Sequence, residues 1–468
     1  MNRCIYITLL TVLGFNSDSI AQSMKQPPRL VVNITIDQLR SDYLELYAPL
    51  YGNDGFKRLL NEGLVFANAS YPFAPVDRAS ATALLATGTT PYYNSIVASE
   101  WLNRNTLQPE SCVKATGKAL LSPENILTST VGDELKMATQ GQAGVFSIAP
   151  YSDASIISAG HAANGAAWPK NGKWENSGYY SPANSLLQSY CRRQTVTHDI
   201  NKSIIDLALS IIHDGTAGAD SITDILNIMF ARYPYTIETK PHAGDRMLEA
   251  YTSLDRNIAE LVRAVEDKMP LERVLFVLTG TGYSEEEEKD NERFRIPTGQ
   301  FNITRTKNLL NIYLSAIYGN GQYVEANYKT HLYLNRKLID QKNINYSDVL
   351  RRSQEFLLDI SGVRNVYTSL QLRLSDSNFI RNIRNGFYSE RSGDIIIEVS
   401  PGWKTIDEDR NTSYTQRLDN IQFPIVFFGA GINHECITSP VTTDRIAPTI
   451  AKTIRIRAPN ACTAIPLF

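Results

Sequence analysis

The chain has 468 residues, of which 43% are hydrophobic and 20% are charged, and its formal net charge is −2 at pH 7. This composition is typical of a globular protein and fits either one large α/β domain with an inserted subdomain or two domains. The near-neutral charge, without a long run of lysine or arginine, excludes a protein built to bind the phosphate backbone of nucleic acids.

The first residues have the pattern of a signal peptide. Arg3 supplies a short basic region, and the apolar run 5–15 that follows it is too short to span a bilayer. Ser19 and Ala21 are small residues at the −3 and −1 positions of a cleavage site. We therefore expect residues 1–21 to be removed and the mature protein to be periplasmic or secreted, with a buried first strand as the alternative for the run. No later segment is long and apolar enough to predict a transmembrane segment.

Four cysteines remain after that cleavage, and an exported protein can keep disulfides. Four cysteines allow three pairings. The most local choice joins Cys112 to Cys191 and Cys436 to Cys462. Free buried thiols are the alternative.

The first strong structural signal is the β-branched apolar run 30–36 (LVVNITI), which ends at Asp37. Such a run is typical of a buried central strand, here with an acidic residue at its carboxyl end. In open α/β sheets, ligands bind at this edge. A short amphipathic helix with a glycine stop is predicted over 55–63, and a small-residue helix that packs on the sheet over 79–86.

Later segments continue the alternation of strands and helices. Buried strands are predicted over 222–230, 273–278 and 423–429, and a helix over 245–268. This order predicts an α/β fold with a mostly parallel sheet sandwiched by helices.

A separate subdomain is predicted within this fold. Residues 297–410 have helix and strand signals of their own, which indicates an inserted cap. The core then consists of a first part over 22–296 and a C-terminal part over 411–468.

Several segments, in this order and spacing, resemble the PafA-type alkaline phosphatases. These are the monomeric two-zinc branch of the alkaline phosphatase superfamily with a threonine nucleophile, related to type I phosphodiesterases and nucleotide pyrophosphatases. The similarity runs over essentially the whole mature chain and is carried by residues 36–40 (IDQLR), 55–63, 86–91 (ATGTTP), 160–168, 385–403 (NGFYSERSGDIIIEVSPGW) and 444–449 (DRIAPT). The resemblance implies an alkaline-phosphatase-like fold. In active members, zinc ions held by carboxylates and imidazoles activate the nucleophile and stabilise the phosphoryl group.

The sequence departs from this family at the positions that react with phosphate or hold it. The position of the threonine nucleophile is occupied by Arg78, whose guanidinium stays protonated and cannot attack phosphorus. The asparagine, lysine and arginine that hold the phosphate oxygens in the family correspond to Ser99, Tyr151 and Asp153. The last replacement reverses a charge and would repel a phosphate.

The zinc ligands of the family are also largely missing. Asp37 is the one ligand that is retained, and Glu238 is a further candidate near the position of a second aspartate–histidine pair. The next pair reads Thr281-Gly282, and the last histidine falls near Ser413. One carboxylate cannot hold two zinc ions, so we expect no zinc and no other cofactor in this protein.

Two further expectations follow from the resemblance. Asp37 and Arg78 occupy positions that share one zinc ion in the family, so we expect the guanidinium to lie within about 6 Å of the carboxylate and to supply positive charge in place of the metal. His161 lies in a matching segment but outside the metal set, which predicts a packing or hydrogen-bonding role.

An intact scaffold without its chemistry predicts a pseudoenzyme that works by binding an envelope protein, a glycan or a lipid. The cap is the expected contact surface because tyrosine is enriched at the centres of interfaces, although packing inside the cap is the alternative for each of Tyr313, Tyr318, Tyr323, Tyr328 and Tyr333. The alternative function is a phosphomonoesterase or phosphodiesterase with an atypical single-metal site. Its candidate residues near the cleft are Asp77, Ser80, Thr82, Glu100 and Glu238.

Overall fold

The computed structural model describes residues 26–114, 117, 120–183, 185–233, 243–284, 295, 297–375, 377–415 and 421–468. The predicted signal peptide and Glu238 lie outside the described residues. Within those ranges, no helix combines the length and the apolar character needed to cross a bilayer.

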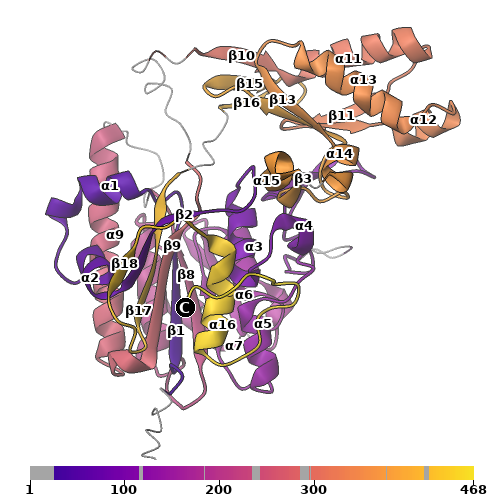
Figure 1. The fold of residues 1–468 in the computed structure, drawn as a ribbon. Helices are drawn as coiled ribbons and strands as arrows, with labels where there is room; N and C mark the ends of the chain where they lie inside the picture. Colours follow the sequence, from indigo (N-terminus) through magenta and orange to yellow (C-terminus); the bar gives the residue numbers. More distant parts are fainter. Residues whose placement is uncertain are drawn as a thin grey trace, which may run out of the picture.

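A ten-stranded sheet forms the centre of the larger lobe (Figure 1). Its strand order is β18-β2-β17-β9-β1-β8-β5-β6-β7, with β19 beside β2. The strands are β1 (Leu30–Ile36), β2 (Leu64–Ser70), β5 (Val145–Ile148), β6 (Gly165–Lys170), β7 (Lys173–Asn176), β8 (Asp224–Phe230), β9 (Val274–Gly280), β17 (Phe423–Gly429), β18 (Glu435–Ile437) and β19 (Val441–Thr442). The four predicted strands are confirmed as β1, β8, β9 and β17.

The first predicted strand lies at the middle of the sheet. β1 pairs in parallel with β8 on one side and with β9 on the other. Its side chains alternate between the two faces, so Leu30 and Val32 join one hydrophobic core and Val31 joins the other. A strand covered on both faces needs apolar residues throughout, which explains the continuous run in the sequence.

Helices cover both faces of the sheet (Figure 1). One face carries α2 (Phe56–Glu62), α8 (Ile200–His213) and α9 (Ala243–Glu266); the other carries α3 (Arg78–Thr87), α5 (Val131–Ala138), α6 (Ser152–Ala159) and α16 (Ile446–Thr453). The three predicted helices match α2, α3 and α9 to within two residues at each end. The predicted α/β class, a mostly parallel sheet sandwiched by helices, is therefore confirmed.

A smaller lobe, which we call the cap, stands above the sheet (Figure 1). It has two sheets, β10-β15-β16 and β11-β12-β14-β13, and a hydrophobic core of its own. Its strands are β10 (Gly299–Asn302), β11 (Val324–Tyr328), β12 (His331–Leu334), β13 (Val363–Thr368), β14 (Ile395–Val399), β15 (Trp403–Asp407) and β16 (Thr412–Thr415). Its helices are α11 (Ile303–Tyr318), α12 (Arg336–Gln341), α13 (Tyr346–Leu358), α14 (Ser369–Leu374) and α15 (Arg381–Asn385).

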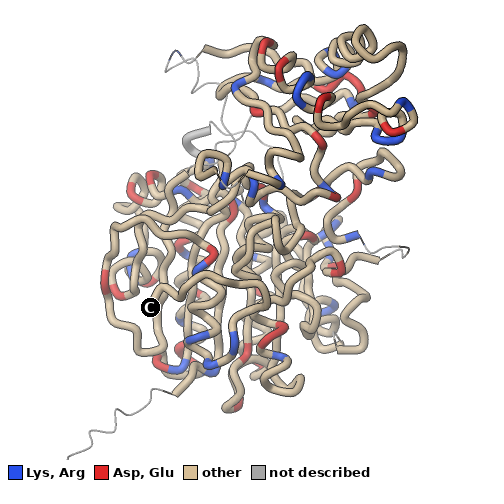
Figure 2. The backbone as a smooth tube through the Cα atoms, turned by 45° about the vertical axis from the view of Figure 1, so that its right-hand side comes forward, with Lys and Arg blue, Asp and Glu red and all other residues tan. Residues whose placement is uncertain are grey.

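A hairpin of the larger lobe reaches the cap. It consists of β3 (Glu100–Asn103) and β4 (Gln108–Ser111), and Arg104 in its turn forms an ion pair of 2.9 Å with Asp394 of the cap. Arg391 of the cap donates in return to the backbone oxygens of Ser95 and Asn125 at 2.8 and 2.9 Å. Charged groups thus join the two lobes. Elsewhere basic and acidic residues are interspersed over both lobes, in keeping with the small net charge (Figure 2).

The tyrosines of the cap are used for packing and internal hydrogen bonds. Tyr323 and Tyr333 are buried to within 1% of full burial. Tyr313 stacks on Phe356 with the ring centroids 4.7 Å apart, and the hydroxyl of Tyr318 donates to Asp348 at 2.5 Å. Tyr328 likewise donates to Glu100. Tyr323 and Tyr333 are therefore core residues of the cap. Tyr313, Tyr318 and Tyr328 are partly exposed, and the expected contact surface of the cap stays a prediction.

All four cysteines of the mature chain are free thiols in this structure. Cys112 and Cys191 are buried, whereas Cys436 is exposed and Cys462 is partly exposed. Neither predicted pairing is formed, and the alternative of free buried thiols describes Cys112 and Cys191 but not the other two.

Candidate functional site

The residues at the family's reactive positions come together at the carboxyl edge of the large sheet. Asp37 follows β1, and Thr281 and Tyr283 follow β9, which lies beside it. Arg78 is the first residue of α3, and Asp153 lies in the first turn of α6. This is the edge where an open α/β sheet binds its ligands.

A cleft of about 560 Å³ opens at this edge. Among its lining residues are Arg78, Ser99, Tyr151 and Asp153, so the four positions that are changed relative to the active family face one cavity.

Arg78, Tyr151 and Asp153 contact one another, and we call them the Arg78 cluster. The guanidinium donates to Asp153 through Nη2 at 2.8 Å and through Nε at 3.3 Å, a bidentate geometry. Its central carbon lies 3.7 Å from the centroid of the Tyr151 ring, which adds a cation–π contact. In this cluster the positive charge of Arg78 is therefore paired with Asp153, and its guanidinium lies over the Tyr151 ring.

The Arg78 guanidinium keeps its positive charge although it is largely buried. Burial disfavours the charged form of Arg78, but the carboxylate of Asp153 outweighs that effect and raises the pKa of the guanidinium above its ordinary value. Asp37 adds a smaller effect of the same sign through its charge. Arg78 is therefore a permanent cation at the position of the family's nucleophile.

Arg78 forms an ion pair that the sequence did not suggest. The expected partner was Asp37, the retained metal ligand, but the ion pair of Arg78 is with Asp153. Asp37 instead accepts hydrogen bonds from the hydroxyls of Thr281 at 2.9 Å and Tyr283 at 3.0 Å, and its side chain is 2% exposed. Thr281 occupies a position that the resemblance aligns with a metal ligand of the family. Its hydroxyl group donates a hydrogen bond to Asp37, the ligand that is retained.

The donors around Asp37 do not fit a zinc ion. A protein zinc site needs three or four carboxylate, imidazole or thiolate ligands, and no group of three such side chains with suitable spacing occurs in the part of the chain that the structure describes. Two of the partners of Asp37 are neutral hydroxyl groups that donate to it. Ser413, which takes the place of the last histidine, lies in β16 of the cap.

Three of the candidates for a new catalytic site, Asp77, Ser80 and Thr82, take part in hydrogen bonds at the start of α3. The Asp77 carboxylate caps the start of α3 and accepts from Ser99 through both its N–H at 2.8 Å and its hydroxyl at 2.6 Å. Ser80 completes the capping box, and Thr82 donates to the backbone oxygen of Arg78 at 2.8 Å. These bonds set the position of Arg78, and the Ser99–Asp77 contact is the one hydroxyl–carboxylate pair among them.

His161 has the hydrogen-bonding role that the sequence suggested. Its Nδ1 lies 3.0 Å from an Asp133 oxygen and its Nε2 lies 3.0 Å from the backbone oxygen of Ile126. The bond to Asp133 raises the pKa of His161 above its ordinary value, although burial opposes the shift. The residue holds α5 against the loop before β6.

The fold and the site together define a protein with an alkaline-phosphatase-like architecture. The model of the family described as type I phosphodiesterase / nucleotide pyrophosphatase matches residues 31–421, and the chain belongs to that family. Within the alkaline phosphatase superfamily it is a PafA-type member, as the sequence indicated.

The relatives cover nearly the whole chain. It is 26% identical to the Myroides odoratus protein named calcium-transporting ATPase, over 97% of this chain and 96% of the relative. It is 24% identical to the alkaline phosphatase PafA of Elizabethkingia meningoseptica, over 94% of each. The crystal structure of wild-type PafA superimposes with a TM-score of 0.80 at 22% identity, over 94% of this chain and 98% of the other. The murine ectonucleotide pyrophosphatase/phosphodiesterase 5 superimposes with a TM-score of 0.56 at 11% identity, over 92% of this chain.

Proposed function

We propose that this protein is a non-hydrolytic member of its family, a pseudoenzyme of the cell envelope that acts by binding. The observation that carries the proposal is the Arg78 cluster. The position of the nucleophile holds a guanidinium, and that guanidinium is paired with a carboxylate at the position where active relatives hold phosphate.

Hydrolysis at this cleft meets two physical obstacles. A hydroxyl group attacks phosphorus at neutral pH only when a metal ion or a base lowers its pKa, and the donors near Asp37 do not fit zinc. A phosphate that enters the cleft also meets the Asp153 carboxylate, which must either repel it or give up the ion pair with Arg78.

Retention of the cleft supports a binding role. The cavity of about 560 Å³ is within the size range of small-molecule sites, and Lys170, Glu175 and Lys329 add charged groups to its lining. The partner classes that we propose are an envelope protein, a glycan and a lipid headgroup, and the envelope location rests on the predicted signal peptide.

The competing function is hydrolysis of phosphate mono- or diesters with a single metal ion. The name of the relative PafA, an alkaline phosphatase, favours it. It requires ligands in addition to Asp37, and Glu238, which is outside the described residues, is the remaining candidate from the sequence.

Purified mature protein is expected to release no 4-nitrophenol from 4-nitrophenyl phosphate or from its bis-ester, with or without added zinc. The reason is the absence of both an activated nucleophile and a fitting donor set. The Asp37→Asn variant is the matched control, because it removes the one retained ligand. Hydrolysis that co-elutes with the wild-type protein and disappears in Asp37→Asn would refute the proposal.

A further inference from the structure

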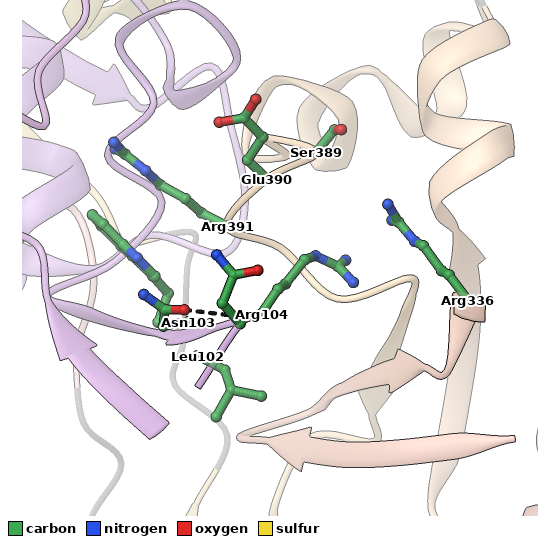
Figure 3. Close-up of a pocket in the computed structure, with 9 residues that line it drawn as sticks. Leu102, Asn103, Arg104, Arg336, Ser389, Glu390 and Arg391 are labelled. Carbon is green, nitrogen blue, oxygen red and sulfur yellow. Dashed lines mark hydrogen bonds between the residues drawn. The ribbon is translucent and has the colours of Figure 1, made fainter. Parts of the chain in front are cut away.

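A second cavity lies between the two lobes, apart from the cleft. It has a volume of about 360 Å³ and is lined by the β3–β4 hairpin on one side and by the cap on the other (Figure 3). This volume is in the range of pockets that bind small molecules. Its lining is predominantly polar, which suggests a polar ligand.

Two arginines of this cavity share one carboxylate. Arg104 of the hairpin turn and Arg336 of α12 both contact Asp394, at 2.9 Å from Nη1 and 3.1 Å from Nε respectively. Asp394 lies behind them with its side chain completely buried. Among these three side chains, one negative charge faces two positive charges. Glu325 is a further acid near them, and its carboxyl group interacts with the charges of Arg104, Lys337 and Arg336.

Arg391 is a third arginine of the lining, and among the described residues none of its hydrogen bonds goes to a carboxylate. The acceptors of Arg391 are oxygens of Ser95 and Asn125, all of them neutral. Burial lowers the pKa of Arg391 below its ordinary value, although the charges of neighbouring groups, Glu390 and Glu110 among them, oppose that shift. Glu390 is exposed, and its carboxylate points away from Arg104 and Arg336 (Figure 3).

The cavity also offers groups that an added ligand can reach. The Arg336 side chain is 49% exposed. The Arg104 side chain is 19% exposed and also lines the cavity. Asn105 and Ser389 are exposed residues of the lining, and their side chains can bond to hydroxyl groups.

We propose that this cavity binds a small organic phosphate, with the phosphate beside Arg104 and Arg336 and the hydroxyl-bearing part of the ligand beside Asn105 and Ser389. Guanidinium groups present planar pairs of donors that match phosphate oxygens. A phosphate monoester carries a charge of about −1.5 to −2 at pH 7, which complements the arginine charges of the cavity better than a carboxylate does. The site is separate from the cleft, so the proposal stands or falls independently of the loss of hydrolysis.

Calorimetric titration of the mature protein with glucose 6-phosphate, inorganic phosphate, glucuronate and glucose tests the proposal. Glucose 6-phosphate is expected to bind most tightly, with an affinity that falls as salt is added, and glucose is expected not to bind. Arg336→Gln should weaken the binding of the sugar phosphate by about tenfold or more, because a charge-assisted hydrogen bond is lost. The matched control is Arg351→Gln on α13, which removes an arginine of similar exposure (54%) outside the cavity lining and should leave affinity unchanged.

A second variant avoids the ion pair that joins the lobes. Ser389 is exposed, so Ser389→Asp adds a negative charge to the lining without disturbing the fold, and it should weaken binding where Ser389→Asn does not. Equal binding of glucose and glucose 6-phosphate would overturn the proposal. So would equal losses in Arg336→Gln and Arg351→Gln, or unchanged affinity in Ser389→Asp. Inorganic phosphate that binds as tightly as the sugar phosphate would overturn the assignment of an organic ligand.

Discussion

Replacement of Asp394 by alanine is expected to lower the free energy of unfolding by about 3–5 kcal/mol, the cost of breaking a buried ion pair. The carboxylate is fully buried and accepts from Arg104, from Arg336, from the hydroxyl of Tyr346 at 2.7 Å and from the N–H of Leu334 at 2.8 Å. Burial opposes ionisation of Asp394, but Arg104 and the other donors hold its pKa below the ordinary value. Alanine leaves two guanidinium groups without their shared counter-ion.

Urea denaturation followed by circular dichroism measures this effect. Glu355→Ala is the control, because Glu355 pairs with Arg351 at the surface with its side chain 58% exposed. An exposed pair contributes about 0–1 kcal/mol. A loss in Asp394→Ala no larger than that of the control would show that the junction between the lobes does not depend on this carboxylate.

The Arg78 cluster is expected to behave as one energetic unit. Arg78→Met alone should destabilise the protein by about 2–3 kcal/mol, because it leaves the Asp153 carboxylate, which is 8% exposed, without its counter-ion. The loss is smaller than for a fully buried pair because the Arg78 side chain is 22% exposed. Asp153→Asn alone leaves a guanidinium without its counter-ion. The double variant should lose less than the sum of the two, with a coupling energy of about 1–3 kcal/mol.

The control for this double-mutant cycle is an exposed pair of the same types. Arg263 and Asp54 form an ion pair with side chains 63% and 40% exposed. The cycle of Arg263→Met and Asp54→Asn should give a coupling energy below about 1 kcal/mol. Coupling in the Arg78–Asp153 cycle that is no larger than in this control would mean that the two residues are neighbours without a shared energetic role.

The sequence was informative where a pattern is local. Residues 30–36 predicted the central strand correctly because a strand covered on both faces must be apolar throughout. The resemblance aligned Arg78, Ser99, Tyr151 and Asp153 with the family's nucleophile and phosphate-holding positions, and the structure brings all four to one cleft. Matching segments on both sides of each position made these assignments possible.

Partners across the fold could not be predicted in the same way. Asp37 and Asp153 both lie at the carboxyl edge of the sheet, and the sequence suggested only Asp37 as a neighbour of Arg78. The ion pair with Asp153 depends on side-chain geometry that the sequence does not show. The Arg104–Asp394 pair joins residues that are 290 positions apart, on a hairpin and on the cap. The cap tyrosines could not be assigned to a surface or a core because tyrosine suits both.

The central claim is that the Arg78 cluster has replaced the zinc centre of the family. The most direct test is the zinc content of the mature protein, measured by mass spectrometry after incubation with zinc and gel filtration, with Asp37→Asn treated in parallel. Because Asp37 already accepts from Thr281 and Tyr283, the account predicts well below one zinc ion per chain and no difference between the two proteins. Two zinc ions per chain in the wild type, lost in Asp37→Asn, would contradict it.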